Sequence, residues 1–233
     1  MKICVHGIPG LPLGKRNLKD ARLDQADQLV EAKKKVYAQV DAVGEEELVQ
    51  ADAILTSDAG FPDLLLHDLE FLENRLGRSP EEAEKAVLLK LQAAIEAGTP
   101  ARKVELSTEE REAIAAHRLL TDKPITVATE ADLADHDALL LRTFHEAGWI
   151  TYLTVGGKEN RAWAICAGET AWEAAGAIHT DIQKGFIRAE IISFADFAEA
   201  GGETEAKRAG KQRLETKTYV MQDCDLVNFR FNK

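Results

Sequence analysis

The stretch "AIHTDIQKGFIRAEIISF" (Ala177–Phe194) decides the fold of the last third of the chain. It joins the end of one segment, Thr170–His179, to a second segment, Gly185–Phe194, that is rich in β-branched and aromatic residues. The first segment predicts a helix and the second predicts a strand. We therefore expect a helix and a strand to form the centre of a small α+β sheet in this region.

The residues on both sides of this stretch supply further strands. "TYLTV" (Thr151–Val155) and "RAWAI" (Arg161–Ile165) flank the glycine-rich turn "GGKEN", which predicts a β-hairpin. Downstream, "ETEAKRAGK" predicts a short helix and "TYVMQDCDLVNFRF" predicts a second hairpin. Two hairpins around a central helix describe a β-grasp fold, which we expect over residues 149–233.

The N-terminal part has a different pattern, in which strands alternate with a helix. "KICVH" (Lys2–His6) predicts a short buried strand, and "DARLDQADQLVEA" (Asp20–Ala32) has the apolar spacing of a helix. "KVYAQVDAV" (Lys35–Val43) and "ADAILTSDA" (Ala51–Ala59) predict two more strands, and "KPITVAT" (Lys123–Thr129) another. This alternation predicts a small α/β sheet.

The middle of the chain predicts helices. Leucines recur at helical spacing up to Gly77, which we expect to end the first helix; they are Leu65, Leu69, Leu72 and Leu76. A second helix is expected to begin with Ser79 as its N-cap and to end at Gly98. The short connection predicts an antiparallel helical hairpin over about residues 63–120. Its leucine stripe is a candidate surface for a protein partner or a homodimer.

Composition and charge limit the classes of function. The 233 residues carry a formal net charge of −11, but residues 149–233 hold 11 Lys and Arg against 12 Asp and Glu. Non-specific nucleic-acid binding by the acidic N-terminal part is therefore not expected. The three cysteines (Cys4, Cys166 and Cys224) are scattered, and no apolar run reaches the length of a membrane helix. We expect a cytoplasmic protein with reduced thiols, no metal site and no membrane segment.

Three stretches resemble the C-terminal end of the YchF family of Obg-like ATPases. They are "IHTDIQKGFIRAE" (Ile178–Glu190), "GETEAKRAGKQRLE" (Gly202–Glu215) and "NFRFN" (Asn228–Asn232). "VDAVG" (Val40–Gly44) falls where that family has its Walker B motif. The resemblance implies a truncated, P-loop-like α/β region with a helical-hairpin insertion over residues 1–148. It also implies a TGS domain, a β-grasp fold, over residues 149–233, so the expected fold class is α/β plus α+β.

The stretch "GIPGLPLGKRN" (Gly7–Asn17) resembles a phosphate-binding loop but departs from its motif. The motif requires a glycine five residues before the glycine of the Gly-Lys pair, with four residues between the two glycines, and a hydroxyl residue directly after the lysine. Here Pro9 occupies the first position and Arg16 the second, and an arginine cannot replace the magnesium-binding hydroxyl. We therefore expect no enzymatic activity, no catalytic residue and no cofactor. The alternative is residual binding of ATP or GTP with Mg²⁺ at vestigial positions, namely Gly14, Lys15, Asp41 and Gly44.

Basic and aromatic side chains are interleaved in the C-terminal part, a pattern that favours binding of phosphates and bases. The candidate residues for binding RNA or a partner are Lys184, Phe186, Arg188, Lys211, Arg213 and Arg230. The resemblance to TGS domains favours RNA, the ribosome or a translation-related partner, and no DNA specificity is expected. The sequence therefore predicts a non-catalytic, TGS-containing binding protein, with nucleotide binding or hairpin-mediated protein interaction as alternatives.

Overall fold

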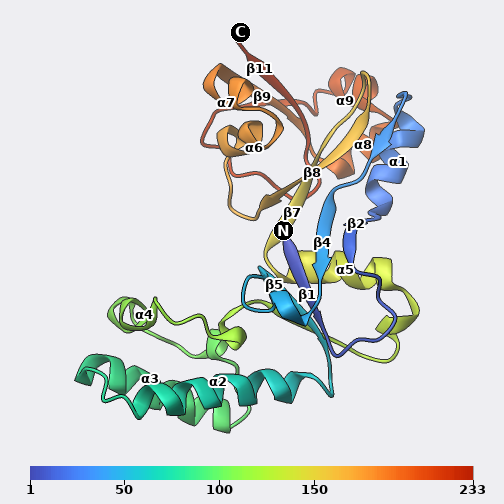
Figure 1. Cartoon of the computed structure of the whole chain (residues 1–233). Helices are drawn as coiled ribbons and strands as arrows, with labels where there is room; N and C mark the ends of the chain where they lie inside the picture. Colours follow the sequence, from blue (N-terminus) through green and yellow to red (C-terminus); the bar gives the residue numbers. More distant parts are fainter. Residues whose placement is uncertain (233) are drawn as a thin grey trace. The chain divides into compact units, whose positions relative to one another are not determined.

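The computed structural model describes residues 1–232, which form two compact units. The first unit, unit 1, contains residues 1–16 and 41–147 (Figure 1). The second, unit 2, contains residues 17–40 together with the C-terminal part from residue 148 onward. The domain boundary expected from the sequence lies between residues 148 and 149 and assigns residues 17–40 to the N-terminal part. In the structure these residues belong to unit 2.

The core of unit 1 is a mostly parallel sheet. Its strand order is β2-β4-β1-β5-β6, where the strands are β1 (Lys2–His6), β2 (Gly14–Asn17), β4 (Gln39–Val43), β5 (Ala53–Ser57) and β6 (Ile125–Ala128). β1 runs parallel to β4 and to β5, and β5 runs parallel to β6. Ile3, Cys4, Ile54 and Leu55 are completely buried, as expected for central strands of a parallel sheet. The predicted α/β sheet is therefore confirmed.

Helices and short 3₁₀ turns complete unit 1. They are η1 (Glu45–Glu47), α2 (Phe61–Leu76), α3 (Glu82–Glu96), η2 (Ala101–Lys103), α4 (Thr108–Ile114), η3 (Leu120–Asp122), η4 (Asp132–Ala134) and α5 (His136–Glu146). α2 and α3 pack as the predicted hairpin, and Arg75 near the end of α2 bonds Glu84 near the start of α3, 2.6 Å from Nε to Oε1. The predicted cap at Ser79 is wrong, because Ser79 has a left-handed φ of 52° and α3 begins only at Glu82.

A buried carboxylate fixes the chain after α4 to the hairpin. Asp68 of α2 is 1% exposed and accepts hydrogen bonds from the Leu120 and Thr121 amides, both 2.8 Å long, and from the Thr121 hydroxyl. Three donors satisfy the charge of a carboxylate that burial would otherwise penalise. The sequence pattern of leucines identifies the apolar stripe of α2 but does not identify this polar contact.

Unit 2 contains a six-stranded mixed sheet with the order β10-β9-β11-β7-β8-β3. The strands are β3 (Lys35–Val36), β7 (Trp149–Thr154), β8 (Asn160–Cys166), β9 (Phe186–Ile192), β10 (Arg213–Glu215) and β11 (Leu226–Phe231). The helices are α1 (Ala21–Leu29), α6 (Ala171–Ile178), α7 (Thr180–Lys184), α8 (Phe194–Ala200) and α9 (Glu203–Arg208). One core cluster joins α6 to the sheet, and Tyr152, Ala175 and Ile191 are buried in it.

The predicted β7–β8 hairpin is confirmed, whereas the predicted hairpin over Thr218–Phe231 is wrong. β11 pairs along its length with β9 in antiparallel orientation and lies parallel to β7 where Leu226 faces Leu153. The residues before β11 form a turn in which the Tyr219 hydroxyl donates to Asp225, at 2.9 Å. The period-two pattern identified strand residues but could not identify their partners, which are distant in sequence.

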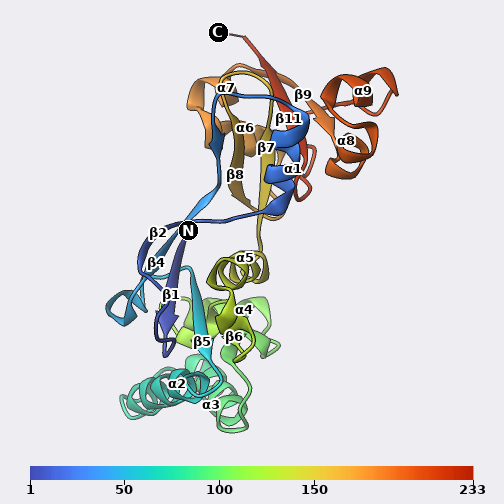
Figure 2. The same ribbon diagram turned by 90° about the vertical axis from the view of Figure 1, so that its right-hand side faces the viewer.

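Residues 17–40 are built into unit 2 by strand pairing and buried polar contacts. β3 lies parallel to β8 at the edge of the sheet, and α1 contacts β8 and α8 (Figure 2). Asn160 is fully buried and donates to the Asp27 carboxylate, at 2.8 Å, and to the Val30 carbonyl, at 2.7 Å. Because such contacts tie the helix to the sheet, the segment belongs structurally to the C-terminal part of the chain.

Candidate functional site

The predicted nucleotide-binding residues Gly14 and Lys15 lie on a strand and not in a phosphate-binding loop. Both are exposed residues of β2, and Gly14 has a left-handed φ of 98°. A phosphate-binding loop places its amides at the beginning of a helix, where the helix dipole favours anions. Here the next helix, α1, begins at Ala21 and is capped by the Asp20 carboxylate. Lys15 is therefore not at the N-terminus of the helix that follows it in the chain.

The other two predicted positions are separated along the sheet. Asp41 faces Lys2 at the start of β1, whereas the loop that begins at Gly7 follows the opposite end of that strand. Gly44 follows β4, and its carbonyl accepts a contact from the Cys4 thiol at 3.4 Å. The register therefore does not bring the Asp41 carboxylate to the loop.

The Glu45 carboxylate lies at the end of β1, where the loop begins. Glu45 Oε1 lies 3.0 Å from His6 Nδ1 and accepts a longer contact from the Gly7 amide, at 3.3 Å. Groups that bind phosphate are positively charged or donate hydrogen bonds. The Glu45 carboxylate is negatively charged and would repel a phosphate at this amide. No group of three or more His, Cys, Asp or Glu side chains within residues 1–232 is arranged to hold a metal ion. The residues present at this loop therefore do not fit a magnesium-bound triphosphate.

The six predicted RNA- or partner-binding residues do not form one surface. Arg188 of β9 and Arg230 of β11 are exposed and face each other across the two strands. Arg213 of β10 pairs with Ile191 of β9. Arg188 lies three residues before Ile191 in that strand, so its side chain points to the other side of the sheet. Lys211 pairs with Asp196 at 2.8 Å. The structure thus brings Arg188 and Arg230 together and places Arg213 on the opposite face.

The two remaining candidates differ in exposure. Phe186 is half-buried, and its ring lies 6.0 Å from the Phe229 ring, at the edge of the core cluster. Lys184 is exposed at the end of α7. Phe186 therefore contributes mainly to packing, while Lys184 remains available to a ligand.

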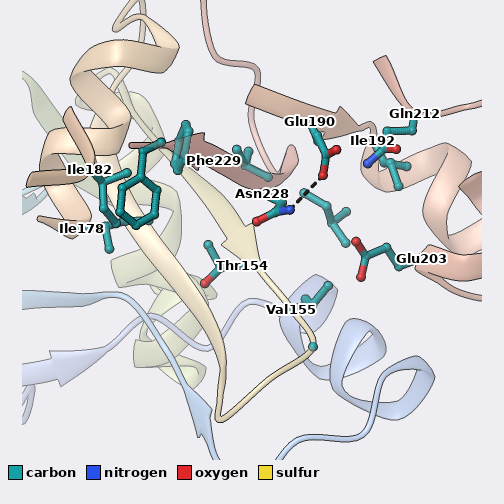
Figure 3. Close-up of a pocket in the computed structure, with 14 residues that line it drawn as sticks. Thr154, Val155, Ile178, Ile182, Glu190, Ile192, Glu203, Gln212, Asn228 and Phe229 are labelled. Carbon is teal, nitrogen blue, oxygen red and sulfur yellow. Dashed lines mark hydrogen bonds between the residues drawn. The ribbon is translucent and has the colours of Figure 1, made fainter. Parts of the chain in front are cut away.

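A pocket of about 340 Å³ lies beside β11 (Figure 3). One side is apolar and includes Ile178, Ile182 and Phe229, and the other side carries the polar groups of Glu190 and Asn228. Within the described part of the chain, β11 pairs with β7 at one position, Leu226 with Leu153. The pocket lies beside the residues of β11 that follow this position and that pair with β9. It can accept a small amphipathic group, with hydrogen bonds at one end and apolar contacts at the other.

The Glu190 carboxylate of the pocket is already neutralised. Glu190 is 7% exposed, accepts a 2.8 Å hydrogen bond from the Asn228 amide and forms an ion pair with Arg230. Burial alone raises the pKa of a carboxyl group, but the contacts with Asn228 and Arg230 outweigh burial and hold the pKa of Glu190 below its ordinary value. Glu190 is therefore ionised at neutral pH and holds Arg230 over the sheet next to Arg188.

Sequence reasoning missed a group of basic side chains in the part of unit 2 that precedes residue 41. Lys33, Lys34 and Lys35 are consecutive and exposed, and β3 brings them to the edge of β8 near Lys158 and Arg161. The run of three lysines is visible in the sequence. Its significance is hidden there because the segment lies within the acidic N-terminal part.

Comparisons with known proteins identify the family. The family described as "YchF-GTPase_C: Protein of unknown function (DUF933)" matches residues 149–232. "Ribosome-binding ATPase YchF" of Bacillus subtilis (strain 168) is 32% identical over 235 residues, which cover 73% of this chain. The protein of the same name from Escherichia coli O157:H7 is 35% identical over 232 residues, with the same coverage. The chain is a homologue of the YchF family. It spans 64% of the length of these two YchF proteins.

The fold is also found among solved structures. "Structure of the Schizosaccharomyces pombe YchF GTPase" superposes with a TM-score of 0.76 and covers 99% of this chain and 97% of that chain, at 20% identity. "Crystal Structure of GTP binding protein from Pyrococcus horikoshii OT3" gives a TM-score of 0.52 at 15% identity. These structures support the two-sheet, mixed α/β architecture described above.

The expectation that this chain is not an enzyme is contradicted by these comparisons. The curated YchF homologues are named ATPases, and the solved YchF structure is named a GTPase. The expectation rested on departures from nucleotide-binding motifs in this chain, among them the altered loop between Gly7 and Asn17. Altered motifs describe the sites that carry them and do not define the activity of a family. As for the membrane, no helix among residues 1–232 is both long and apolar enough to span a bilayer.

Proposed function

We propose that this chain binds the ribosome through unit 2. The observation that carries the proposal is its homology to proteins named ribosome-binding over 73% of its length. The charge distribution supports the choice of unit. Residues 17–40 and 148–233 carry 16 basic and 16 acidic side chains, whereas the rest of the chain carries 13 and 24. An RNA-rich surface repels the acidic unit more strongly than the neutral one.

The proposed contact includes the exposed pair Arg188 and Arg230. Glu190 holds Arg230, whereas Arg188 forms no ion pair within residues 1–232. Arginine side chains recognise phosphate through two parallel hydrogen bonds, so two neighbouring guanidinium groups suit an RNA backbone. We take residues 149–233 to be the TGS-type β-grasp domain that presents this pair.

Cosedimentation with ribosomes at graded salt tests the proposal. Arg188→Glu should reduce the fraction that sediments, because it reverses a charge on the proposed contact and leaves the core unchanged. Arg208→Glu is the matched control, since Arg208 is exposed in unit 2, at 77%, and lies outside the proposed contact. Wild-type protein that stays in the supernatant at every salt concentration would refute the proposal.

Nucleotide binding and hydrolysis in unit 1 is a second candidate function, favoured by the names of the YchF homologues. Because the loop residues do not fit a magnesium-bound triphosphate, other groups would have to provide the site, with Lys15 as an exposed cation on β2. A phosphate-release assay with ATP and GTP tests this candidate. Turnover that Lys15→Ala abolishes, and that Lys217→Ala leaves unchanged, would place the site in unit 1.

A protein partner or a second copy on the helical hairpin is a third candidate. Three large apolar side chains of α2 and α3 are exposed, namely Leu66, Phe71 and Leu89. Exposed apolar side chains on a helical hairpin favour contact with another protein. Light scattering after size exclusion tests this candidate, and a mass that falls to that of a monomer in Leu66→Glu would support it.

A further inference from the structure

We infer that a groove at the edge of unit 2, together with the basic side chains beside it, binds single-stranded RNA. The surface is made by the residues just before β3, the start of β8 and the turn before β8, and we call it the basic edge: Lys33, Lys34, Lys158 and Arg161. This surface is separate from Arg188 and Arg230. It deepens the proposed ribosome binding by naming an RNA-contacting surface, and it rests on that proposal only for the natural source of the RNA.

Backbone pairing brings these side chains together although they are distant in sequence. Ala32 forms an isolated bridge with Gly157, and Lys35 and Val36 of β3 pair with Asn160 and Arg161 of β8. The pairing fixes the run of lysines beside the turn that carries Lys158. The cluster is therefore a property of the fold.

The lysines of the basic edge have no internal neutralising partner. Lys33, Lys34 and Lys158 are exposed and form no ion pair within residues 1–232. The neighbouring Lys35 differs, because Asp24 holds it at 2.6 Å. These three ammonium groups outnumber the two carboxylates at the same corner, exposed Glu31 and Glu159, which pairs with Arg161, so the corner is locally positive in a chain of net charge −11. Phosphate is the ligand that such point charges suit.

A groove beside the lysines offers a flat surface for a base. The groove, about 440 Å³, is lined by Lys34, Tyr37, Arg161 and Trp163, among others. The Arg161 guanidinium lies 4.6 Å from the centre of the Trp163 ring, and Glu159 pairs with the same guanidinium at 3.1 Å. Arg161 is thus held by its ring partner and its carboxylate partner before any ligand arrives.

The stacked arginine distinguishes RNA from an acidic protein as the occupant. Unpaired bases stack on guanidinium planes, and single-stranded RNA presents bases and phosphates at neighbouring positions. A carboxylate-rich protein would use the lysines but would gain little from the flat face of Arg161. The combination of unpaired lysines and a stacked guanidinium therefore favours an unpaired stretch of RNA.

Fluorescence anisotropy with a labelled oligouridylate and the full chain tests the inference. Lys33→Glu/Lys34→Glu/Lys158→Glu should weaken binding on the order of ten-fold or more. It should also flatten the dependence of log Kd on log salt by about 0.7 for each phosphate that the variant no longer neutralises. The matched control is Lys85→Glu/Lys90→Glu/Lys103→Glu, which makes the same charge change on exposed lysines of unit 1. Equal weakening in both triple variants, or none in the first, overturns the inference.

Arg161→Lys separates base stacking from charge. It keeps the positive charge but removes the flat guanidinium, so the affinity should fall on the order of five-fold while the salt dependence stays unchanged. Polyglutamate serves as the competitor that mimics an acidic protein. If polyglutamate binds as tightly as the oligonucleotide and Arg161→Lys has no effect, the basic edge is not an RNA site.

The outcomes for this surface and for the proposed function are distinguishable. Oligonucleotide binding without cosedimentation with ribosomes would refute the proposed function and keep the basic edge. Cosedimentation that persists while wild-type protein fails to bind the oligonucleotide would refute the basic edge and keep the proposed function.

Discussion

At the scale of single residues, buried polar side chains fix parts of the fold that apolar patterns do not specify. Asn160 shows this most clearly, because its amide donates to Asp27 and Val30 and its oxygen accepts from the Gly156 amide, at 3.0 Å. A single buried amide therefore joins α1 to the turn before β8. No periodic pattern marks such a residue in the sequence, and we predicted neither its burial nor its partners.

Asn160→Ala should lower the free energy of unfolding by about 2–3 kcal/mol, because it leaves buried donors and acceptors without partners. Urea unfolding followed by circular dichroism measures this change. Asn74→Ala, an exposed asparagine on α2, is the control and should change stability by less than about 0.5 kcal/mol. Equal effects in the two variants would show that the Asn160 contacts do not stabilise unit 2.

Glu84 gives the helical hairpin a pH dependence. Its contact with Arg75, and then that with His117, lower its pKa from 4.5 to about 2. Because the pKa is lower in the folded state, the stabilisation is present above pH 4.5 and is lost as the pH falls toward about 2.

Thermal unfolding between these pH values should therefore show a fall in Tm that Glu84→Gln makes shallower. Glu73→Gln, an exposed residue of α2, is the control and should keep the wild-type dependence. An unchanged slope in Glu84→Gln would show that this carboxylate does not link protonation to folding.

At the scale of elements, the sequence predicted the existence of most helices and strands but fewer of their partners. The strands β1 and β5, the α2–α3 hairpin and the β7–β8 hairpin were predicted, because each has a strong periodic pattern and local turn signals. α8 was missed, since Phe194 was assigned to the end of a strand although Ser193 caps a helix there. β11 was placed in a local hairpin, because pairing between distant strands leaves no local signal.

The candidate site was predictable only in part, for the same reason. Arg188 and Arg230 were both named from the sequence, but only strand pairing shows that they are neighbours and that Arg213 is not. Lys33 and Lys34 were not named, because their proximity to Lys158 depends on the parallel pairing of β3 with β8. The sequence gives the chemistry of each side chain. Which side chains form one site also depends on the register with which the strands pair, and the sequence does not give that register.

The contact of α1 with the C-terminal part of unit 2 should depend on Arg22. Its guanidinium binds Asp20 and reaches Asp223, with 2.6 Å between Nη1 and Oδ2. Arg22→Ala should increase hydrogen–deuterium exchange in Ala21–Leu29, because the variant removes the charged link between this helix and the C-terminal part. Exchange in α2 serves as the internal control. Unchanged exchange in α1 would show that other contacts hold this helix.

At the scale of the whole molecule, acidic charge and basic surfaces are divided between the two units. All of the net negative charge lies in residues 1–16 and 41–147, whereas unit 2 is formally neutral and carries both the arginine pair and the basic edge. A protein with this distribution should approach an RNA-rich particle with unit 2. The homology to YchF proteins named ribosome-binding agrees with this distribution.

Chemical crosslinking of the full chain to purified ribosomes, read by mass spectrometry, tests this account most directly. The account predicts crosslinks from residues 148–232 and from the Lys33–Lys35 segment, and few from the hairpin at residues 61–96. Crosslinks concentrated in the hairpin, or no chain recovered with the ribosomes, would contradict it.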